Sequence, residues 1–163
     1  MIKRFLPTLA ALFLLAAVSS AQTGFTPSIL PKPTKIEAGN VNAKFTLTPE
    51  AKIVCKFDDK SLKFALNELD RLTTEIFGVK FKRSSKVKGT GNVIIRHDSS
   101  IKDEGYKLAI TPENIIIKAK DAAGVFYAVQ TLKQIVPVQA YETPLDLKSL
   151  ALPTLCIEDA PHF

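Results

Sequence analysis

The sequence predicts an α+β fold in which two helices pack on one face of a mainly antiparallel sheet. Two segments, near residues 59–77 and 121–137, have the apolar spacing of a helix, and the other regular segments are short and rich in β-branched residues. A tight turn at Pro112-Glu113 separates two of these strands, which is typical of a hairpin. The order of strands and helices favours both helices on one side of the sheet.

The first 21 residues are typical of a secretory signal peptide. Lys3 and Arg4 precede an apolar run from Leu9 to Val18, and small residues lead to Ala21. The alternative is a membrane anchor, but this run is shorter than the roughly 20 residues that a spanning helix needs. We therefore expect cleavage near Ala21, a secreted or periplasmic protein, and no stable membrane span.

The rest of the chain is expected to form one domain with short strands. Residues 22–33 contain three prolines and should form an extended lead-in. The α+β domain is expected over residues 34–152, and residues 153–163 should hold the final strand and a junction. Residues 141–146 are expected to lie in a loop. Strands are predicted at residues 34–37, 44–47, 51–56, 92–97, 106–111, 114–120 and 154–158.

The first helix is expected to be amphipathic in the ordinary way. It should begin at Asp59 or Ser61 and end near Phe77, because Gly78 is a typical C-terminal stop. One face carries all of its apolar residues, which indicates a single contact with the sheet. These residues are Leu62, Ala65, Leu66, Leu69, Leu72 and Ile76.

The second helix is apolar on more than one side. Asp121 is its expected N-cap, and Pro137 should end it. One apolar stripe follows helical spacing, and Ala123, Phe126 and Tyr127 widen it. Such a helix needs cover on both sides, one from the sheet and one from something outside these residues. The alternative is that it lies centrally in the core of this domain alone.

The two cysteines, Cys55 and Cys156, are far apart and fall in predicted strands. An oxidising compartment would permit a disulfide between them, and the alternative is two buried thiols. Their spacing is not that of a zinc-binding pair, and only His97 and His162 add soft ligands. We expect no metal and no cofactor.

Charged clusters are interpreted as exposed surface. The basic run from Lys80 to Lys88 could meet phosphate or an acidic polysaccharide, but lysines also protect exposed strand edges, and we favour that interpretation. A secreted chain is not expected to bind nucleic acid. Gly89-Thr90-Gly91 lacks the lysine-serine/threonine ending of a phosphate loop and should be a turn.

No catalytic residue is predicted in this chain. The acidic pairs are sequence neighbours, which on a strand point to opposite sides, whereas a pair of acid and base catalysts needs two carboxylates placed across one reacting bond. Ser99 and Ser100 beside His97 indicate a polar turn rather than a nucleophilic triad. The acidic pairs are Asp58-Asp59, Asp103-Glu104 and Glu158-Asp159.

Four segments carry a family resemblance: ILPKPTKIEAG at residues 29–39, EGYKLAI at 104–110, DAAGVFYAVQTLKQIVP at 121–137 and IEDAPHF at 157–163. In this order and spacing the chain resembles the N-terminal accessory domain of family 20 glycoside hydrolases, the β-N-acetylhexosaminidases. Ala128 stands where this family often has glycine, and His162 where arginine is common. Neither position carries the chemistry.

The resemblance implies that a catalytic (β/α)8 barrel should follow this domain. Family 20 enzymes use the 2-acetamido oxygen of the substrate as nucleophile, with an aspartate and a glutamate of the barrel. Those residues would lie beyond Phe163. The implied parent protein hydrolyses terminal β-linked N-acetylhexosamine residues, and this segment is expected to be inactive alone.

The resemblance also implies that the helices lie between the sheet and the barrel. The candidates for this interdomain contact are Phe126, Tyr127, Gln130, Thr131, Gln134, Asp159, Pro161 and Phe163. Asp159 is further expected to accept hydrogen bonds from backbone amides at the junction.

Two alternatives to the hexosaminidase interpretation remain. The chain could act alone as a secreted carbohydrate-binding or interaction module, although it has no tryptophan for an aromatic platform. It could also be the accessory domain of another glycosidase family, such as α-N-acetylglucosaminidases or α-glucuronidases.

Overall fold

The computed structural model describes residues 27–57, 60–142 and 147–161. The predicted signal peptide, the helix start at Asp59 and the candidate contact Phe163 lie outside these ranges. None of the helices within them is long and apolar enough to cross a membrane.

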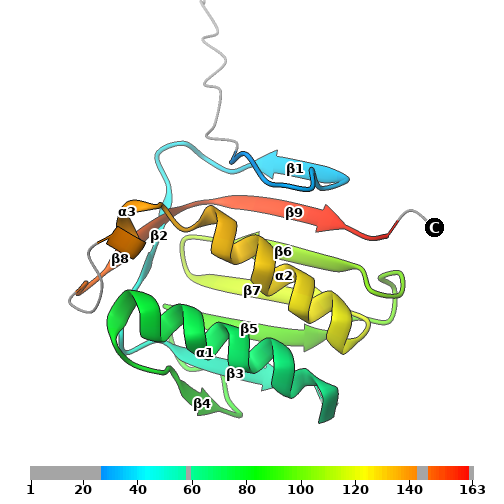
Figure 1. The fold of residues 1–163 in the computed structure, drawn as a ribbon, viewed down its shortest axis with the longest axis horizontal. Helices are drawn as coiled ribbons and strands as arrows, with labels where there is room; N and C mark the ends of the chain where they lie inside the picture. Colours follow the sequence, from blue (N-terminus) through cyan, green and yellow to red (C-terminus); the bar gives the residue numbers. More distant parts are fainter. Residues whose placement is uncertain (1–26, 58–59, 143–146, 162–163) are drawn as a thin grey trace, which may run out of the picture.

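A seven-stranded sheet forms the centre of the fold, with strand order β1-β9-β6-β7-β5-β3-β4 (Figure 1). A separate two-stranded sheet pairs β2 with β8. The strands are β1 (Lys35–Ala38), β2 (Lys44–Leu47), β3 (Lys52–Lys56), β4 (Lys82–Ser84), β5 (Asn92–His97), β6 (Tyr106–Ile110), β7 (Asn114–Ala119), β8 (Leu150–Pro153) and β9 (Leu155–Asp159).

The predicted α+β class is confirmed, and the large sheet is mixed. Its β1, β9, β6 and β7 strands are antiparallel neighbours, and the predicted hairpin joins β6 to β7. Strands β7, β5, β3 and β4 are parallel neighbours. The β3–β4 pair is parallel because α1 (Lys63–Phe77) connects the two strands, and a crossover helix returns the chain in the same direction.

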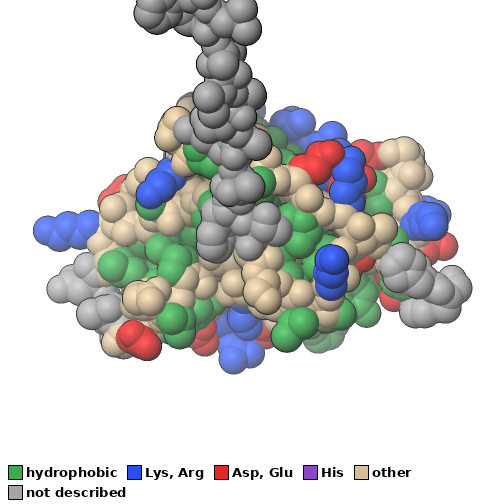
Figure 2. Space-filling model, turned by 90° about the horizontal axis from the view of Figure 1, so that it is seen from above, with side chains coloured by type: hydrophobic (Ala, Val, Ile, Leu, Met, Phe, Trp, Pro, Cys, Tyr) green, Lys and Arg blue, Asp and Glu red, His purple; other side chains and the backbone are tan. Residues whose placement is uncertain are grey.

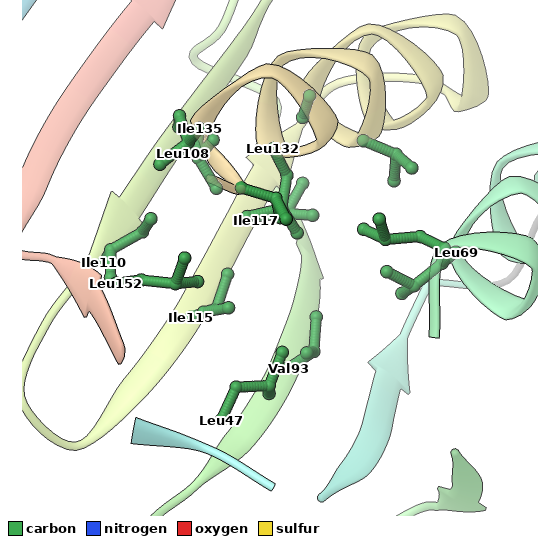
Figure 3. Packing of buried hydrophobic residues seen from close by; sticks show 14 of the residues in the cluster. Leu47, Leu69, Val93, Leu108, Ile110, Ile115, Ile117, Leu132, Ile135 and Leu152 are labelled. Atoms are coloured by element: carbon green, nitrogen blue, oxygen red, sulfur yellow. The ribbon is translucent and has the colours of Figure 1, made fainter. Parts of the chain in front are cut away.

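Both long helices cover one face of the large sheet (Figure 1). Directly opposed residues on neighbouring strands point to the same face of the sheet. The strand register therefore gathers apolar side chains into rows on the face that the helices cover. Figure 3 shows Leu132 and Ile135 of α2 (Ala122–Ile135) pointing toward Leu108 and Ile117 of the sheet. One cross-strand row of this core is Ile36, Ile157, Leu108, Ile117, Ile95 and Cys55.

The helix ends follow local signals. A 3-10 turn, Lys60–Leu62, leads directly into α1. Gly78 ends α1 in the left-handed conformation at φ 70°, and its N–H donates to the Thr74 carbonyl at 2.9 Å. This is the C-terminal stop that the sequence predicted, since glycine adopts that conformation without a steric penalty.

Three short elements were not predicted. Strands β4 and β8 are absent from the expected list, and α3 (Gln139–Glu142) lies where a loop was expected. Each has three or four residues, too few to establish a periodicity. Lys82 and Arg83 lie in β4 at the edge of the sheet, as the edge interpretation of the basic run predicts.

The cysteines are free and lie on opposite faces of the sheet. Cys55 belongs to the helix-covered row, whereas Cys156 opposes Ala109 on the other face. Their strands are four positions apart in the sheet, which places the two Cα atoms on the order of 19 Å apart. A disulfide requires a Cα–Cα distance of less than about 7 Å. The two cysteines are therefore half-buried free thiols rather than a disulfide. Burial raises the pKa of both.

Candidate interdomain junction

Four distant segments of the chain meet at one corner of the domain. A groove of about 260 Å³ lies between them. It adjoins the end of β9, the start of β6, the outer side of α2 and the lead-in before β1. Its lining residues are Pro31, Lys32, Glu104, Tyr106, Tyr127, Asp159, Ala160 and Pro161. Three of the predicted contact residues, Tyr127, Asp159 and Pro161, are therefore brought together here.

Asp121 holds the start of α2 against the loop before β6. Its backbone is extended, as expected of an N-cap, and its Oδ1 accepts a hydrogen bond from the Gly124 N–H at 2.8 Å. Its Oδ2 accepts a second hydrogen bond from the Glu104 N–H at 2.7 Å. Glu104 has a φ of 58°, a conformation that non-glycine residues seldom adopt. The Asp121 carboxylate thus fixes both the helix start and this loop.

Gly124 allows the helix to approach the same loop closely. A Cβ atom at this position would lie 2.2 Å from the Gly105 carbonyl oxygen and 3.0 Å from the Ala119 Cβ. The backbone of α2 therefore rests directly on the backbone of the segment before β6. This contact explains the glycine in the DAAGVFYA segment by packing alone.

Tyr106 and Thr131 form a buried hydrogen bond between β6 and α2. Their hydroxyl oxygens are 2.6 Å apart, and burial raises the pKa of the Tyr106 phenol. Thr131 is only 5% exposed, so its side chain lies inside this domain rather than on the outer surface of the helix. Thr131 is thus a predicted contact residue whose side chain the structure places in the interior.

Replacing Tyr106 with phenylalanine is expected to lower the free energy of unfolding by about 1–2 kcal/mol, because the buried Thr131 hydroxyl loses its partner. Urea unfolding monitored by circular dichroism measures this difference. The double variant Tyr106→Phe/Thr131→Val should cost less than the sum of the single variants. Additive costs would contradict a direct coupling between the two hydroxyls.

The remaining predicted residues of α2 differ in exposure. Tyr127 is 41% exposed and its ring meets that of Phe126 edge-on, with centroids 6.0 Å apart. Phe126 is half-buried and packs against the core. Gln130 is half-buried beside Glu68 of α1, at 3.5 Å, whereas Gln134 is exposed. The outer side of α2 is thus formed mainly by Tyr127 and Gln134.

The lead-in is attached to the rest of the domain at two points, one near the C-terminal end of α2 and one at this corner. Gln134 exchanges two hydrogen bonds with the backbone of Leu30, at 2.9 and 3.0 Å. Asp159 accepts hydrogen bonds from the backbone N–H of Thr34 at 3.1 Å and from its hydroxyl at 2.9 Å. The prediction that Asp159 accepts a backbone amide is confirmed. The bond links the first strand to the residues that leave β9.

Large apolar side chains remain exposed along the same side. Leu30 of the lead-in is 76% exposed and Val138, just after α2, is 60% exposed. Figure 2 shows small hydrophobic patches between backbone and other side chains on the surface seen from above. Leu30, Val138 and the groove residues Glu104 and Lys32 were not among the predicted contacts. Three of these four residues lie in the segments ILPKPTKIEAG and EGYKLAI. The family resemblance of those segments was the sequence signal that could have identified them.

A second and larger groove lies at the C-terminal end of α2. It has a volume of about 770 Å³ and runs between this helix end, the lead-in and β8. Gly39 forms one wall, and a Cβ atom there would lie 2.3 Å from the Thr154 hydroxyl oxygen. Val136, Pro137 and Val138 give the groove an apolar side.

Three carboxylates of the acidic pairs, those of Asp103, Glu158 and Asp159, are engaged by protein groups. Glu158 forms an ion pair with Lys107, and Asp103 with Lys120. Asp58 and Asp59 lie outside the described residues. Within the described ranges no cluster of three or more histidine, cysteine, aspartate or glutamate side chains could hold a metal ion.

Comparison with known proteins identifies the family. Residues 26–160 match the family described as glycosyl hydrolase family 20, domain 2. The chain belongs to this family. Within this domain 2, the four segments that meet at the corner are the same four that carried the resemblance in the sequence.

Similar proteins are much longer than this family 20 domain. It is 40% identical over 62 residues to N,N'-diacetylchitobiase of Vibrio harveyi, covering 38% of this chain and 6% of that protein. It is 35% identical over 63 residues to a beta-hexosaminidase of Porphyromonas gingivalis, covering 39% of this chain and 8% of that protein. The matched segments therefore span less than a tenth of the length of these curated relatives.

Solved structures share the fold of this family 20 domain. The β-N-acetylhexosaminidase of Streptomyces coelicolor A3(2) matches with a TM-score of 0.69 and 28% identity, over 86% of this chain and 28% of that chain. The N-acetyl-β-hexosaminidase of Streptomyces plicatus matches with a TM-score of 0.68 and 25% identity, over 85% and 28% of the two chains. The chain corresponds to about a quarter of each enzyme.

Proposed function

We propose that this chain is the non-catalytic N-terminal region of a secreted β-N-acetylhexosaminidase. The parent enzyme would hydrolyse terminal β-linked N-acetylhexosamine residues, and this region would pack on its (β/α)8 barrel and stabilise it. The match of residues 26–160 to domain 2 of glycosyl hydrolase family 20 carries the proposal. The relatives named above support it, since this chain covers only a small part of their length.

The surface proposed to face the barrel is the outer side of α2 with the junction groove. Tyr127 and Gln134 are exposed there, and Leu30 and Val138 extend the apolar surface at one end. Asp159, Ala160 and Pro161 line the groove where the chain leaves β9. An apolar patch at the point of chain exit is the arrangement expected for a contact with a following domain.

The activity test compares two forms of the protein on an aryl β-N-acetylglucosaminide. One form is residues 22–163, and the other continues through about 350 further residues of the gene to include a (β/α)8 barrel. Hydrolysis by the long form alone is the expected result. Activity in neither form would favour a stand-alone module or the accessory domain of another glycosidase family, and activity in the short form would refute the non-catalytic role.

Residues 22–163 expressed alone are expected to self-associate, because the surface of Tyr127, Leu30 and Val138 would be uncovered. Light scattering measures the association, and Tyr127→Lys should reduce it. Val79→Lys is a matched control, since Val79 is 43% exposed but lies beyond the far end of α1. Monodisperse monomer for the unmodified protein would contradict the prediction.

A further inference from the structure

The face of the large sheet opposite the helices carries a row of charged side chains. Strand register places six of them directly opposite one another on six successive strands, β1, β9, β6, β7, β5 and β3. At the usual strand spacing of about 4.8 Å, the row crosses the sheet over roughly 24 Å. In order, its members are Lys35, Glu158, Lys107, Lys118, Arg96 and Lys56.

One end of this row is a continuous stretch of cations. Glu158 forms an ion pair with Lys107. Lys118, Arg96 and Lys56 follow on adjacent strands, and the described residues contain no carboxylate oxygen within 4 Å of their charged groups. Like charges directly opposite on neighbouring strands are destabilising. Hydrogen bonds from Ser100 and, to a smaller extent, the charge of Lys118 lower the pKa of Asp98, so this carboxylate offsets part of the repulsion without forming an ion pair.

A groove of about 480 Å³ lies over the other end of the row. Lys35, Lys102, Lys107 and Lys118 line it together with three carboxylates. Those carboxylates already accept hydrogen bonds from protein donors. Asp98 accepts from Ser100 at 2.6 Å, Asp159 from Thr34 at 2.9 Å, and Glu158 from Lys107. Lys35 and Lys107 are likewise paired, with Glu37 and Glu158, so the ammonium groups of Lys102 and Lys118, which form no ion pair with the described residues, are the ones best able to bind a further ligand.

We propose that this basic row binds a linear acidic polysaccharide that runs across the strands. Carboxylate or sulfate groups spaced along such a polymer would neutralise Lys118, Arg96 and Lys56 in turn and would release condensed counterions. The row lies on the face of the sheet opposite α2, and the groove at its end adjoins the junction groove, with which it shares Tyr106, Asp159 and Ala160. It would hold an acidic glycan chain near the enzyme without taking part in hydrolysis.

The neighbouring row on the same face favours a polysaccharide over a membrane or a nucleic acid. Its apolar members Ile94 and Val54 are 2% and 0% exposed, so they cannot insert into lipid. The large exposed apolar side chains of the described residues all lie outside the seven strands. Neither row has an aromatic ring on which bases could stack. The second row is Glu37, Cys156, Ala109, Ile116, Ile94, Val54 and Ser84.

The test measures binding of the full-length protein to polygalacturonate and to heparin at several salt concentrations. The variant Lys118→Gln/Arg96→Gln/Lys56→Gln should bind at least about tenfold more weakly at low salt. The negative slope of the logarithm of affinity against the logarithm of salt concentration should become shallower by about 2–3, since three ionic contacts are removed. Hydrolysis of a neutral aryl glycoside should be unchanged, which separates this proposal from the proposed enzymatic function.

A matched control removes three charges elsewhere. Lys60→Gln/Lys63→Gln/Lys80→Gln changes exposed lysines around α1 and should keep the affinity of the unmodified protein. If the two triple variants lost the same affinity, the effect would come from net charge rather than from the row, and the proposal would be overturned. Binding to phosphatidylglycerol vesicles or to single-stranded DNA as tight as to the polysaccharides would overturn the choice of ligand.

Discussion

Replacing Gly124 with alanine is expected to lower the free energy of unfolding by about 3 kcal/mol. The added methyl group would lie 2.2 Å from the Gly105 carbonyl oxygen, a backbone atom that cannot move away alone. In an ordinary helix position the same change stabilises by about 1 kcal/mol, because alanine is the better helix former. Steric overlap should therefore reverse the usual sign. Chemical unfolding at constant pH measures the effect.

Gly89→Ala is the matched control for this variant. Gly89 also has a special backbone, with φ 68°, but no heavy atom lies within 4 Å of the added methyl group. Its cost should be limited to about 1 kcal/mol of backbone strain. A Gly124→Ala protein as stable as the unmodified one would mean that α2 can shift away from the loop, and that the close contact does not constrain the fold.

The helices could be predicted from the sequence because their signals are local. Asp121 and Pro137 bracket α2, and Gly78 ends α1, within the few residues that determine a cap. The side of α2 that faces the sheet was harder to infer. Apolar residues surround most of this helix, so Thr131 could be assigned to either side from the sequence, whereas its burial and its bond to Tyr106 show that it points inward.

The strand pairing required contacts that sequence patterns do not contain. Strand β8 pairs with β2, which lies about a hundred residues earlier in the chain. No single turn joins the two strands, so no local sequence signal indicates the pairing. The parallel pairing of β5 with β3 and β7 likewise depends on which way α1 and its connections return the chain. Alternation of side chains fixes the two faces of a strand but not its neighbours.

The two candidate sites differ in the same way. The junction could be approached from the sequence, because its segments carried the family resemblance. The basic row could not, because Lys56, Arg96 and Lys118 become neighbours only through the strand order. In the sequence each is an ordinary exposed end of an alternating strand. The cluster Lys80 to Lys88, which is conspicuous in the sequence, instead surrounds the edge strand β4.

Replacing Asp121 with alanine is expected to cost about 2 kcal/mol of stability and to loosen the junction corner. The change removes the helix cap, worth about 1 kcal/mol, and the hydrogen bond that holds Glu104 in its left-handed conformation. Hydrogen exchange should rise at the amides of Glu104 and Gly124, the two groups that lose their acceptor. Unfolding measurements and exchange together distinguish this local opening from a uniform loss of stability.

Two further variants decide whether the carboxylate of Asp121 acts through these bonds. Asp121→Asn keeps one side-chain oxygen and is a good N-cap, so it should retain the helix cap and lose only part of the stability. Asp103→Ala removes a carboxylate that is 80% exposed and paired with Lys120, and it should change stability by less than about 1 kcal/mol. If both alanine variants cost the same, general charge rather than the two amide contacts would explain the effect. If only Asp121→Ala is destabilising, one side chain links the helix, the loop before β6 and the corner from which the chain leaves the domain.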